Sequence, residues 1–278
     1  MSSLFDTGIR PLVDKYLAEQ AAKERDYGDY WSASSAGYCM RLNIMRRLGV
    51  PRVPEIQEGW ERTTRVFESG HIFHEWIQGI TKNAGLSIAS EVELQDEDLM
   101  IRGHFDDLVL VDGNLILYDY KTAHSKSFEY AKGRGMSHYH KMQLGTYMYM
   151  LRRYESHVKG SVRPKNNQAW TMGDWEMGML KDLTEARTLK ISKDDLRMAE
   201  DQLLWTPELE KEVVGYWKTL NGYWEKKTMP KCTCLDYEGG FMGKRTKAGK
   251  VYNDYFYNDE PCSLVWYEQW KNNKETKV

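Results

Sequence analysis

The segment GHFDDLVLVDGNLILYDYKT, at residues 103–122, constrains the fold more than any other part of this sequence. Leu, Val and Ile occupy most positions on both sides of Asp112-Gly113, and an Asp-Gly pair favours a two-residue type I′ turn. The segment is therefore predicted to form a β-hairpin. With Asp112 and Gly113 as its loop, Val111 faces Asn114, and the residue numbers of each further pair sum to 225.

This register predicts that Asp106 faces Asp119 and that His104 faces Lys121. Two carboxylates about 5 Å apart across a ladder repel each other, so the pair needs a positive partner. Lys121 shares a strand face with Asp119 and could neutralise one carboxylate in a surface ion network. A divalent cation, Mg²⁺ or Mn²⁺, would neutralise both and leave coordination positions for water and a phosphate oxygen. Lys121 would then orient or help deprotonate that water, or stabilise charge on the phosphate.

The remaining pattern predicts helices and strands in alternating groups, and hence an α/β fold with a mixed central sheet flanked by helices. Helices are expected at 1–24, 33–49, 58–84, 139–153 and 192–227, and strands at 87–95, 99–111, 115–121 and 157–180, with a polar loop at 124–138. We expect a single domain over residues 1–278, with its core at about 58–180.

Composition limits the classes of partner. The chain has 278 residues, of which 41% are hydrophobic and 29% charged, with a net charge of −2. No apolar run approaches the roughly 20 residues of a membrane span, and MSSLFDTGIRPLVDKY lacks the apolar core of a signal peptide. We therefore expect a cytoplasmic chain with no membrane contact. Because the net charge is near zero, nucleic acid would have to bind through local basic patches.

Four short motifs, in this order, resemble those of the PD-(D/E)XK nuclease superfamily. They are GHIFHEW, GHFDD, YDYKT and QLGTY, and together they fall within residues 70–150. The order is most similar to the RecB-type branch, which includes the CRISPR-associated iron–sulfur exonucleases and phage relatives. Phe105 stands where the superfamily signature has its proline.

The resemblance implies a restriction-endonuclease-like core and a role for each matching residue. It implies metal ligation by His74, Asp106, Asp119 and the Tyr120 carbonyl, catalysis by Lys121, substrate contacts by Gln143 and Tyr147, and an acidic residue at Glu93 or Glu91, with Glu93 preferred. A mixed set of His and Asp ligands favours Mn²⁺ over Mg²⁺ more than an all-oxygen set does.

The four cysteines fit a further feature of the resemblance. The iron–sulfur exonucleases place one cysteine before the nuclease core and three after it, and here Cys39 precedes the core while Cys232, Cys234 and Cys262 follow it. This implies a [4Fe–4S] cluster that clamps helical regions at 1–50 and 190–278 together. The C-x-C pair and the 27 residues between Cys234 and Cys262 depart from the family spacing. Zinc and unligated thiols remain alternatives.

The resulting functional hypothesis is a metal-dependent DNA exonuclease that acts on single-stranded or end-frayed DNA in recombination, repair or phage DNA processing. The sequence has no GxxxxGK[ST] motif for ATP-driven unwinding, so the enzyme would need a free DNA end or a helicase or recombination partner. The alternatives are a structure-specific endonuclease and a catalytically idle DNA-binding or scaffold subunit.

Overall fold

The computed structural model describes residues 9–21, 28–48, 60–132, 134–154, 158–162, 178–230, 244–245 and 251–252. The chain divides into two compact units. The sheet unit comprises Tyr27–Gly37 and Gly70–Gly222, and the terminal unit comprises Met1–Asp26, Tyr38–Ser69 and Tyr223–Val278.

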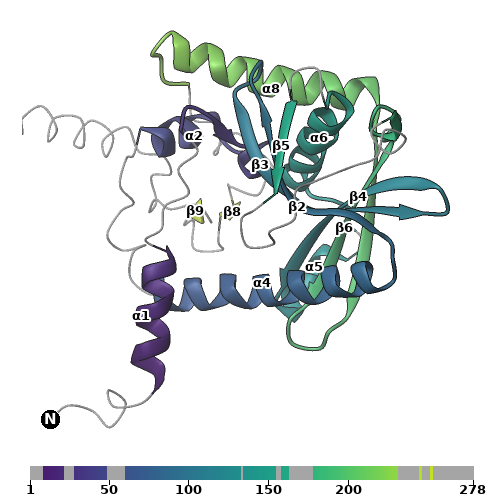
Figure 1. Ribbon diagram of the computed structural model, residues 1–278. Helices are drawn as coiled ribbons and strands as arrows, with labels where there is room; N and C mark the ends of the chain where they lie inside the picture. The colour runs from purple at the N-terminus through teal and green to yellow at the C-terminus, as the bar shows by residue number, and fades with distance from the viewer. Residues whose placement is uncertain are drawn as a thin grey trace, which may run out of the picture. The chain divides into compact units, whose positions relative to one another are not determined.

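The described helices and strands alternate along the chain (Figure 1). The helices are α1 Ile9–Ala21, the 3₁₀-helix η2 Ala33–Ser35, α2 Met40–Arg47, α4 Trp60–Asn83, α5 Ser125–Ala131, α6 His138–Arg152 and α8 Pro207–Glu225. The strands are β1 Trp31–Ser32, β2 Ser87–Asp96, β3 Ile101–Val111, β4 Asn114–Ala123, β5 Val158–Val162, β6 Glu185–Ser192, β7 Met198–Leu204, β8 Lys244–Arg245 and β9 Val251–Tyr252.

The sheet unit contains a mixed sheet, which confirms the predicted fold class. Within the described residues the sheet has seven strands, in the order β5-β2-β3-β4-β6-β7, with β1 beside β3. The β4–β6 and β1–β3 pairs are parallel, and the other pairs are antiparallel. Such a sheet flanked by helices is the architecture of a restriction-endonuclease-like core.

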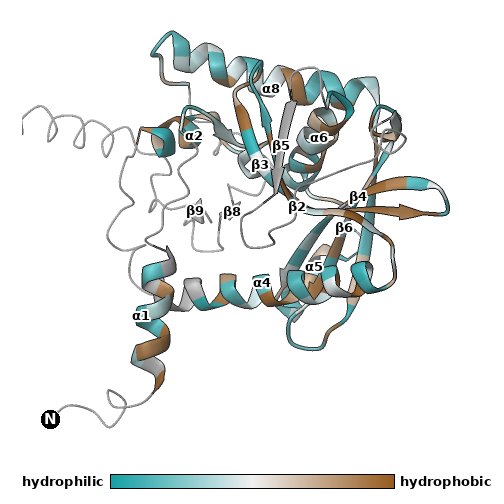
Figure 2. Ribbon diagram, in the orientation of Figure 1, coloured by the Kyte–Doolittle hydropathy of each residue, from teal (hydrophilic) through white to brown (hydrophobic). Residues whose placement is uncertain are grey.

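The β3–β4 hairpin has the predicted register, from Val111 opposite Asn114 to Asp107 opposite Tyr118. Asp112 and Gly113 both have positive φ angles, of 50° and 81°, as a type I′ turn requires. Figure 2 shows a hydrophilic tip joining two largely hydrophobic strands. The local sequence therefore sets the turn and the first five pairs.

Helices cover both faces of the sheet. On one face, Ile77 of α4 packs with Tyr120, Leu189 and Ile191 in a buried cluster. On the other face α6 lies between the sheet and α8, as Figure 1 shows, and a Cβ added at Gly145 of α6 would lie 3.0 Å from side-chain atoms of α8. α6 is consequently buried from Met142 to Leu151.

The region after residue 180 differs from the sequence prediction. Residues 192–227 were expected to be helical, but residues up to Ser192 belong to β6 and Met198–Leu204 forms β7, so that only α8 is helical there. β6 pairs in parallel with β4 along eight residues, from Ile116 opposite Glu185 to Ala123 opposite Ser192. Within the expected helix, antiparallel pairing of β7 with β6, from Ile191 opposite Met198 to Glu185 opposite Leu204, has overridden the local helix preference. A short helix, α5, also lies in the expected polar loop.

Contacts within the terminal unit join the two ends of the chain. Arg65 of α4 forms an ion pair with Asp14 of α1. Arg41 Nε donates to the carbonyl of Pro230 at 2.9 Å, and the Arg47 guanidinium lies 4.3 Å from the centroid of the Trp224 ring. Residues just after Cys39 are therefore held beside residues 224–230.

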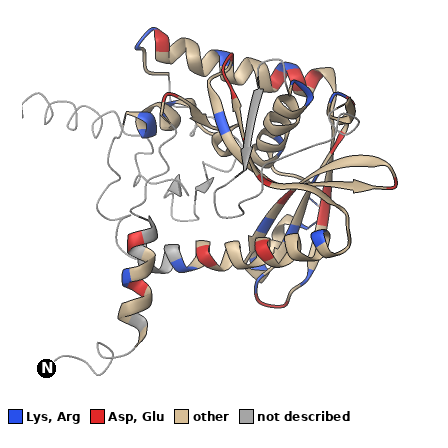
Figure 3. Ribbon diagram, viewed as in Figure 1, with Lys and Arg blue, Asp and Glu red and all other residues tan. Residues whose placement is uncertain are grey.

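Charge is evenly mixed over the described elements. Figure 3 shows Lys and Arg residues interspersed with Asp and Glu, as expected for a net charge of −2. Within the described ranges, no helix is both long and apolar enough to span a membrane.

Candidate functional site

The two strands of the hairpin stop pairing where the predicted carboxylate pair begins. The ladder ends at Asp107 and Tyr118, so the expected cross-strand pairs of Asp106 with Asp119 and of His104 with Lys121 are wrong. His104 instead pairs with Glu93 on the other neighbouring strand, β2. Separation of the strands at this point relieves the close approach of like charges that a continued ladder would impose.

The open end of the hairpin is bridged by a different contact. The backbone N–H of Tyr120 donates to Asp106 Oδ2 at 2.7 Å. Further along the same edge of β3, β1 takes over the pairing, at Ile101 and Arg102. Asp106 thus lies in a part of β3 that no described strand pairs with on this edge. Because no described strand occupies this part of the edge, the Asp106 carboxylate can contact a ligand there.

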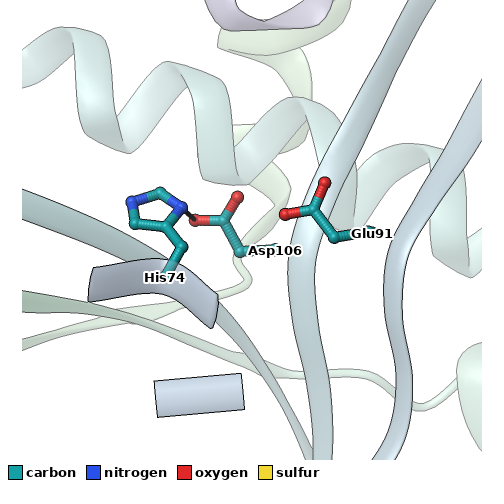
Figure 4. Close-up of side chains that lie close together, drawn as sticks. All are labelled: His74, Glu91 and Asp106. Carbon is teal, nitrogen blue, oxygen red and sulfur yellow. Dashed lines mark ion pairs between the residues drawn. The ribbon is translucent and has the colours of Figure 1, made fainter. Parts of the chain in front are cut away.

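Three possible metal ligands converge at Asp106. Suitable atoms of His74, Glu91 and Asp106 all lie within 4.8 Å of one another, and His74 Nδ1 is 3.6 Å from Asp106 Oδ2. The three side chains come from α4, β2 and β3, and Figure 4 shows the Asp106 carboxylate between the other two. One imidazole nitrogen and two carboxylates form a donor set that suits Mn²⁺ or Mg²⁺.

The charges of this group are unbalanced. Burial and the charges of Asp119 and Glu91 raise the pKa of Asp106 well above its usual value, although Lys121 acts in the opposite direction. Burial also raises the pKa of Asp119, again opposed by Lys121. Burial and the positive charge of Lys121 lower the pKa of His74 to about 4, so its imidazole is neutral at neutral pH. A nearby cation favours the ionised form of carboxyl groups whose pKa values are raised, and a neutral imidazole has a lone pair to donate. These groups are therefore suited to bind a cation.

Lys121 and Gln143 both contact one oxygen of Asp119. Lys121 Nζ lies 2.7 Å from Asp119 Oδ1, and Gln143 Nε2 donates to the same oxygen at 3.2 Å. The other oxygen, Asp119 Oδ2, is buried and has no hydrogen-bond partner within the described part of the chain. Burial would lower the pKa of Lys121, but the carboxylates of Asp119 and Asp106 outweigh it and raise the pKa overall, so the amine is charged. An unsatisfied buried carboxylate oxygen beside the cluster fits a missing ligand.

The structure brings Glu91, and not the preferred Glu93, into the group. Glu93 lies 2.8 Å from Arg102 and 3.1 Å from His104, and so belongs to a separate ion-pair network. Glu91 has a backbone φ of 56°, in the left-handed region that non-glycine residues rarely adopt in a strand. Residues with such strained backbone angles persist only where the surrounding structure holds them in place, and they cluster at functional sites.

Two contacts that sequence reasoning missed support these residues. Gln78, one helical turn after His74, donates from Nε2 to Glu91 Oε1 at 3.1 Å and to the Asp106 carbonyl at 2.9 Å. The fully buried Asp107 accepts hydrogen bonds from the Thr81, Ser87 and Tyr120 hydroxyls. Gln78 could have been found from its i, i+4 spacing to His74. Asp107 directly follows Asp106, and its contact with Thr81 joins this part of β3 to α4.

Two further predicted residues lie near the cluster without joining it. Tyr147 is buried against Gly103, where an added Cβ would lie 2.8 Å from the Tyr147 hydroxyl. The Tyr120 side chain is buried and donates to Asp107, so only its backbone is available to the site. A metal contact by its carbonyl stays a prediction.

The predicted cysteine cluster lies mostly outside the described residues. Cys39 is buried directly before α2, at its N-cap position. Cys232, Cys234 and Cys262 are not among the described residues.

Fold and site together define a nuclease-like core with a candidate centre for a divalent metal, and comparison with known proteins identifies its family. The chain matches the family model of the PD-(D/E)XK nuclease superfamily over residues 17–234, and it belongs to this superfamily. It is therefore a nuclease that hydrolyses phosphodiester bonds of nucleic acid, and nucleases of this superfamily use divalent metal ions.

No curated protein sequence matches the chain at a significant level. The solved structures that are similar to it include the following two. The crystal structure of SSO0001 has 17% sequence identity and a TM-score of 0.47, with 81% of this chain and 94% of that chain covered. The structure of LHK-Exo in complex with dAMP has 14% identity and a TM-score of 0.39, with 72% and 94% covered.

Proposed function

We propose that this protein is a metal-dependent deoxyribonuclease that digests single-stranded or end-frayed DNA from a free end, in the cytoplasm. The observation that carries the metal dependence is the convergence of His74, Glu91 and Asp106 beside the Lys121–Asp119 pair. The preference for DNA ends rests on the order of four sequence motifs that resemble the RecB-type exonucleases. Recombination, repair or phage DNA processing would supply such ends, and a helicase or recombination partner could expose them.

In this proposal His74, Glu91 and Asp106 hold the metal ion, with Asp119 Oδ2 and the Tyr120 carbonyl completing its protein ligands. A bound Mg²⁺ or Mn²⁺ would supply a Lewis acid at a phosphate oxygen and lower the pKa of a bound water. The nitrogen ligand favours Mn²⁺ over Mg²⁺ more than a site of oxygens alone would.

Lys121 is the proposed catalytic lysine. Its amine is charged and held 2.7 Å from Asp119, so it can orient the attacking water or stabilise negative charge that develops on the phosphate. Gln143 lies on α6 and does not titrate. Its amide Nε2 donates to Asp119 Oδ1 and so fixes the direction of the Asp119 carboxylate. Tyr147, four residues later on α6, would pack on the same face of this helix as Gln143.

The mode of cleavage can be tested with three substrates in the presence of Mn²⁺: end-labelled linear single-stranded DNA, the same sequence as a closed circle, and linear single-stranded RNA. We expect loss of the linear DNA by release of short products, with the circle and the RNA intact. Cleavage of the circle would indicate an endonuclease. Digestion of the RNA would refute the restriction to DNA, and failure to cut any substrate would indicate an idle DNA-binding or scaffold subunit.

Substitution of the lysine tests the assigned chemistry. Lys121→Ala should lower the rate on the linear substrate by about 100-fold or more, as loss of a group that stabilises charge in the transition state does. Lys141→Ala is the matched control, because Lys141 pairs with Glu212 on α8 at 2.7 Å and lies outside the site. Full activity of Lys121→Ala would refute the role of this lysine.

We also propose that Cys39, Cys232, Cys234 and Cys262 bind a [4Fe–4S] cluster of structural function, with zinc as the alternative. Support comes from two contacts. Arg41, two residues after Cys39, donates to the carbonyl of Pro230, and Pro230 precedes Cys232 by two residues in the sequence. Arg47 lies over the ring of Trp224. A brown protein with broad absorbance near 400 nm, lost in Cys232→Ser, is the expected result. A colourless protein that contains zinc would favour the alternative.

A further inference from the structure

The amide of Gln78 connects two of the proposed metal ligands to the helix that carries the third. The side chain is 5% exposed, and its Nε2 donates to Glu91 Oε1 on β2 and to the carbonyl of Asp106 on β3. His74 lies four residues earlier on the same helix, α4, so both side chains point to one face. One side chain therefore joins all three elements that form the cluster.

The orientation of this amide follows from the chemistry of its partners. A carboxylate and a backbone carbonyl can only accept hydrogen bonds, whereas an amide NH₂ group has two N–H donors. Only the orientation with Nε2 toward Glu91 and Asp106 satisfies both acceptors. The two donors of Gln78 are therefore both committed to the candidate metal site.

Glu91 needs such a constraint more than an ordinary strand residue does. Its φ of 56° places the backbone in the left-handed region, which residues other than Gly, Asn and Asp rarely adopt. The pairs next to Glu91, Ser90 opposite Asp107 and Val92 opposite Phe105, keep one register, and the register shift of this strand lies earlier, between Ser87 and Ala89. A hydrogen bond to its carboxylate fixes the direction in which this residue presents its oxygens.

We propose that Gln78 is a positioning residue that holds Glu91 and Asp106 in the arrangement that binds the divalent ion. This inference rests on the proposed metal-dependent function. Groups that hydrogen-bond to metal ligands orient them, and loss of such a group usually weakens metal binding by about 10–100-fold. The amide need not touch the metal or the substrate to have this effect.

The test is direct Mn²⁺ titration of the full-length protein, followed by the electron paramagnetic resonance signal of free Mn²⁺. Gln78→Met keeps the length of the side chain and removes both donors. We expect it to bind Mn²⁺ about 10–100-fold more weakly than the wild type. Gln78→Asn withdraws the same amide by one methylene and should also weaken binding, which keeps the test valid if Gln78→Met fails to fold.

Gln95→Met is the matched control. Gln95 lies on β2, and its amide donates to the Tyr30 hydroxyl at 2.7 Å, away from the cluster. The same substitution there should lower stability without weakening Mn²⁺ binding. Equal weakening of Mn²⁺ binding in Gln78→Met and Gln95→Met would overturn the proposal, because the effect would then be a general loss of packing.

A double-mutant cycle separates positioning from stability. If Gln78 acts through Glu91, most of its effect on the remaining Mn²⁺ affinity should disappear when Gln78→Met is added to Glu91→Ala, which removes the acceptor of the Gln78 amide. Additive losses would overturn action through Glu91. Absence of Mn²⁺ binding by the wild type would refute the proposed function itself, whereas wild-type binding with an unchanged Gln78→Met would refute only the role of Gln78.

Discussion

The backbone N–H of Tyr120 donates a hydrogen bond to Asp106 Oδ2 at 2.7 Å; Asp106 lies one residue, and Tyr120 two residues, beyond the last pair of the β3–β4 ladder. The side chain of Asp106 thus replaces the backbone acceptor that a continued ladder would have supplied. The contact fixes a carboxylate between two separating strands, where it faces His74 and Glu91. It also ties the carboxylate to the residue directly before Lys121.

Removing the charge of Asp106 should stabilise the metal-free protein. Burial, Asp119 and Glu91 raise the pKa of this carboxyl in the folded state, so its ionisation at neutral pH opposes folding, and the opposition grows as pH rises above the pKa of an unfolded aspartate. Asp106→Asn keeps the shape and an acceptor for Tyr120. We expect its Tm in EDTA to exceed that of the wild type by roughly 2–4 °C, which corresponds to about 1 kcal/mol.

The same thermal scans with Mn²⁺ provide the second half of this test. Mn²⁺ should raise the Tm of the wild type, because it binds only the folded state, and should leave that of Asp106→Asn unchanged. Asp201→Asn is the control, since Asp201 is ion-paired with Lys190 and its loss should not raise the Tm. A lower Tm for Asp106→Asn in EDTA would contradict the electrostatic account.

Glu91 and Glu93 should respond differently to the same substitution. Glu91→Asn should abolish tight Mn²⁺ binding but preserve folding, because asparagine tolerates the left-handed backbone that this position adopts. Glu93→Asn should retain Mn²⁺ binding and lose some stability, because it breaks the contacts with Arg102 and His104. Mn²⁺ titration and thermal unfolding of both variants decide the assignment. The reverse pattern would restore Glu93 as the ligand.

The choice between these two glutamates shows where sequence reasoning reached its limit. Glu91 and Glu93 are two residues apart, so strand alternation places both on one face and cannot separate them. What separates them is the positive φ of Glu91 and the contact with Gln78, which depend on packing between α4 and β2. The turn at Asp112-Gly113 was predictable because its geometry is set by two adjacent residues.

Gly103, the first residue of the GHFDD motif, should not tolerate a side chain. An added Cβ would lie 2.7 Å from the Ala33 Cβ and 2.8 Å from the Tyr147 hydroxyl. Gly103→Ala should therefore destabilise the fold by about 1–3 kcal/mol through overpacking. We also expect weaker nuclease activity, because Tyr147 must move. Denaturant unfolding and the linear-substrate assay measure the two effects.

Gly79→Ala is the matched control for that variant. Gly79 lies within α4, and an added Cβ there would meet no atom within 4 Å. Alanine should stabilise the helix by about 0.5–1 kcal/mol without affecting nuclease activity. If the Gly103→Ala protein were as stable as Gly79→Ala, Tyr147 would not pack closely on Gly103 in the folded protein.

The strands β6 and β7 illustrate the other limit of prediction. β7 contains Met, Ala, Glu, Gln and Leu, which locally favour helix, and it lies within the 192–227 region that was predicted to be helical. β7 is a strand because it pairs antiparallel with β6, and β6 in turn pairs in parallel with β4, with Thr188 opposite Asp119 and Lys190 opposite Lys121. Such pairing joins residues about 70 positions apart, and no local pattern reports it.

A crystal structure of the wild-type protein soaked with Mn²⁺, with anomalous diffraction data, tests the central claim most directly. The account predicts one anomalous peak within bonding distance of His74 Nδ1 and of carboxylate oxygens of Glu91 and Asp106, with Lys121 still beside Asp119. A peak bound elsewhere, or no peak in crystals whose protein cleaves DNA in the same Mn²⁺ solution, would contradict it.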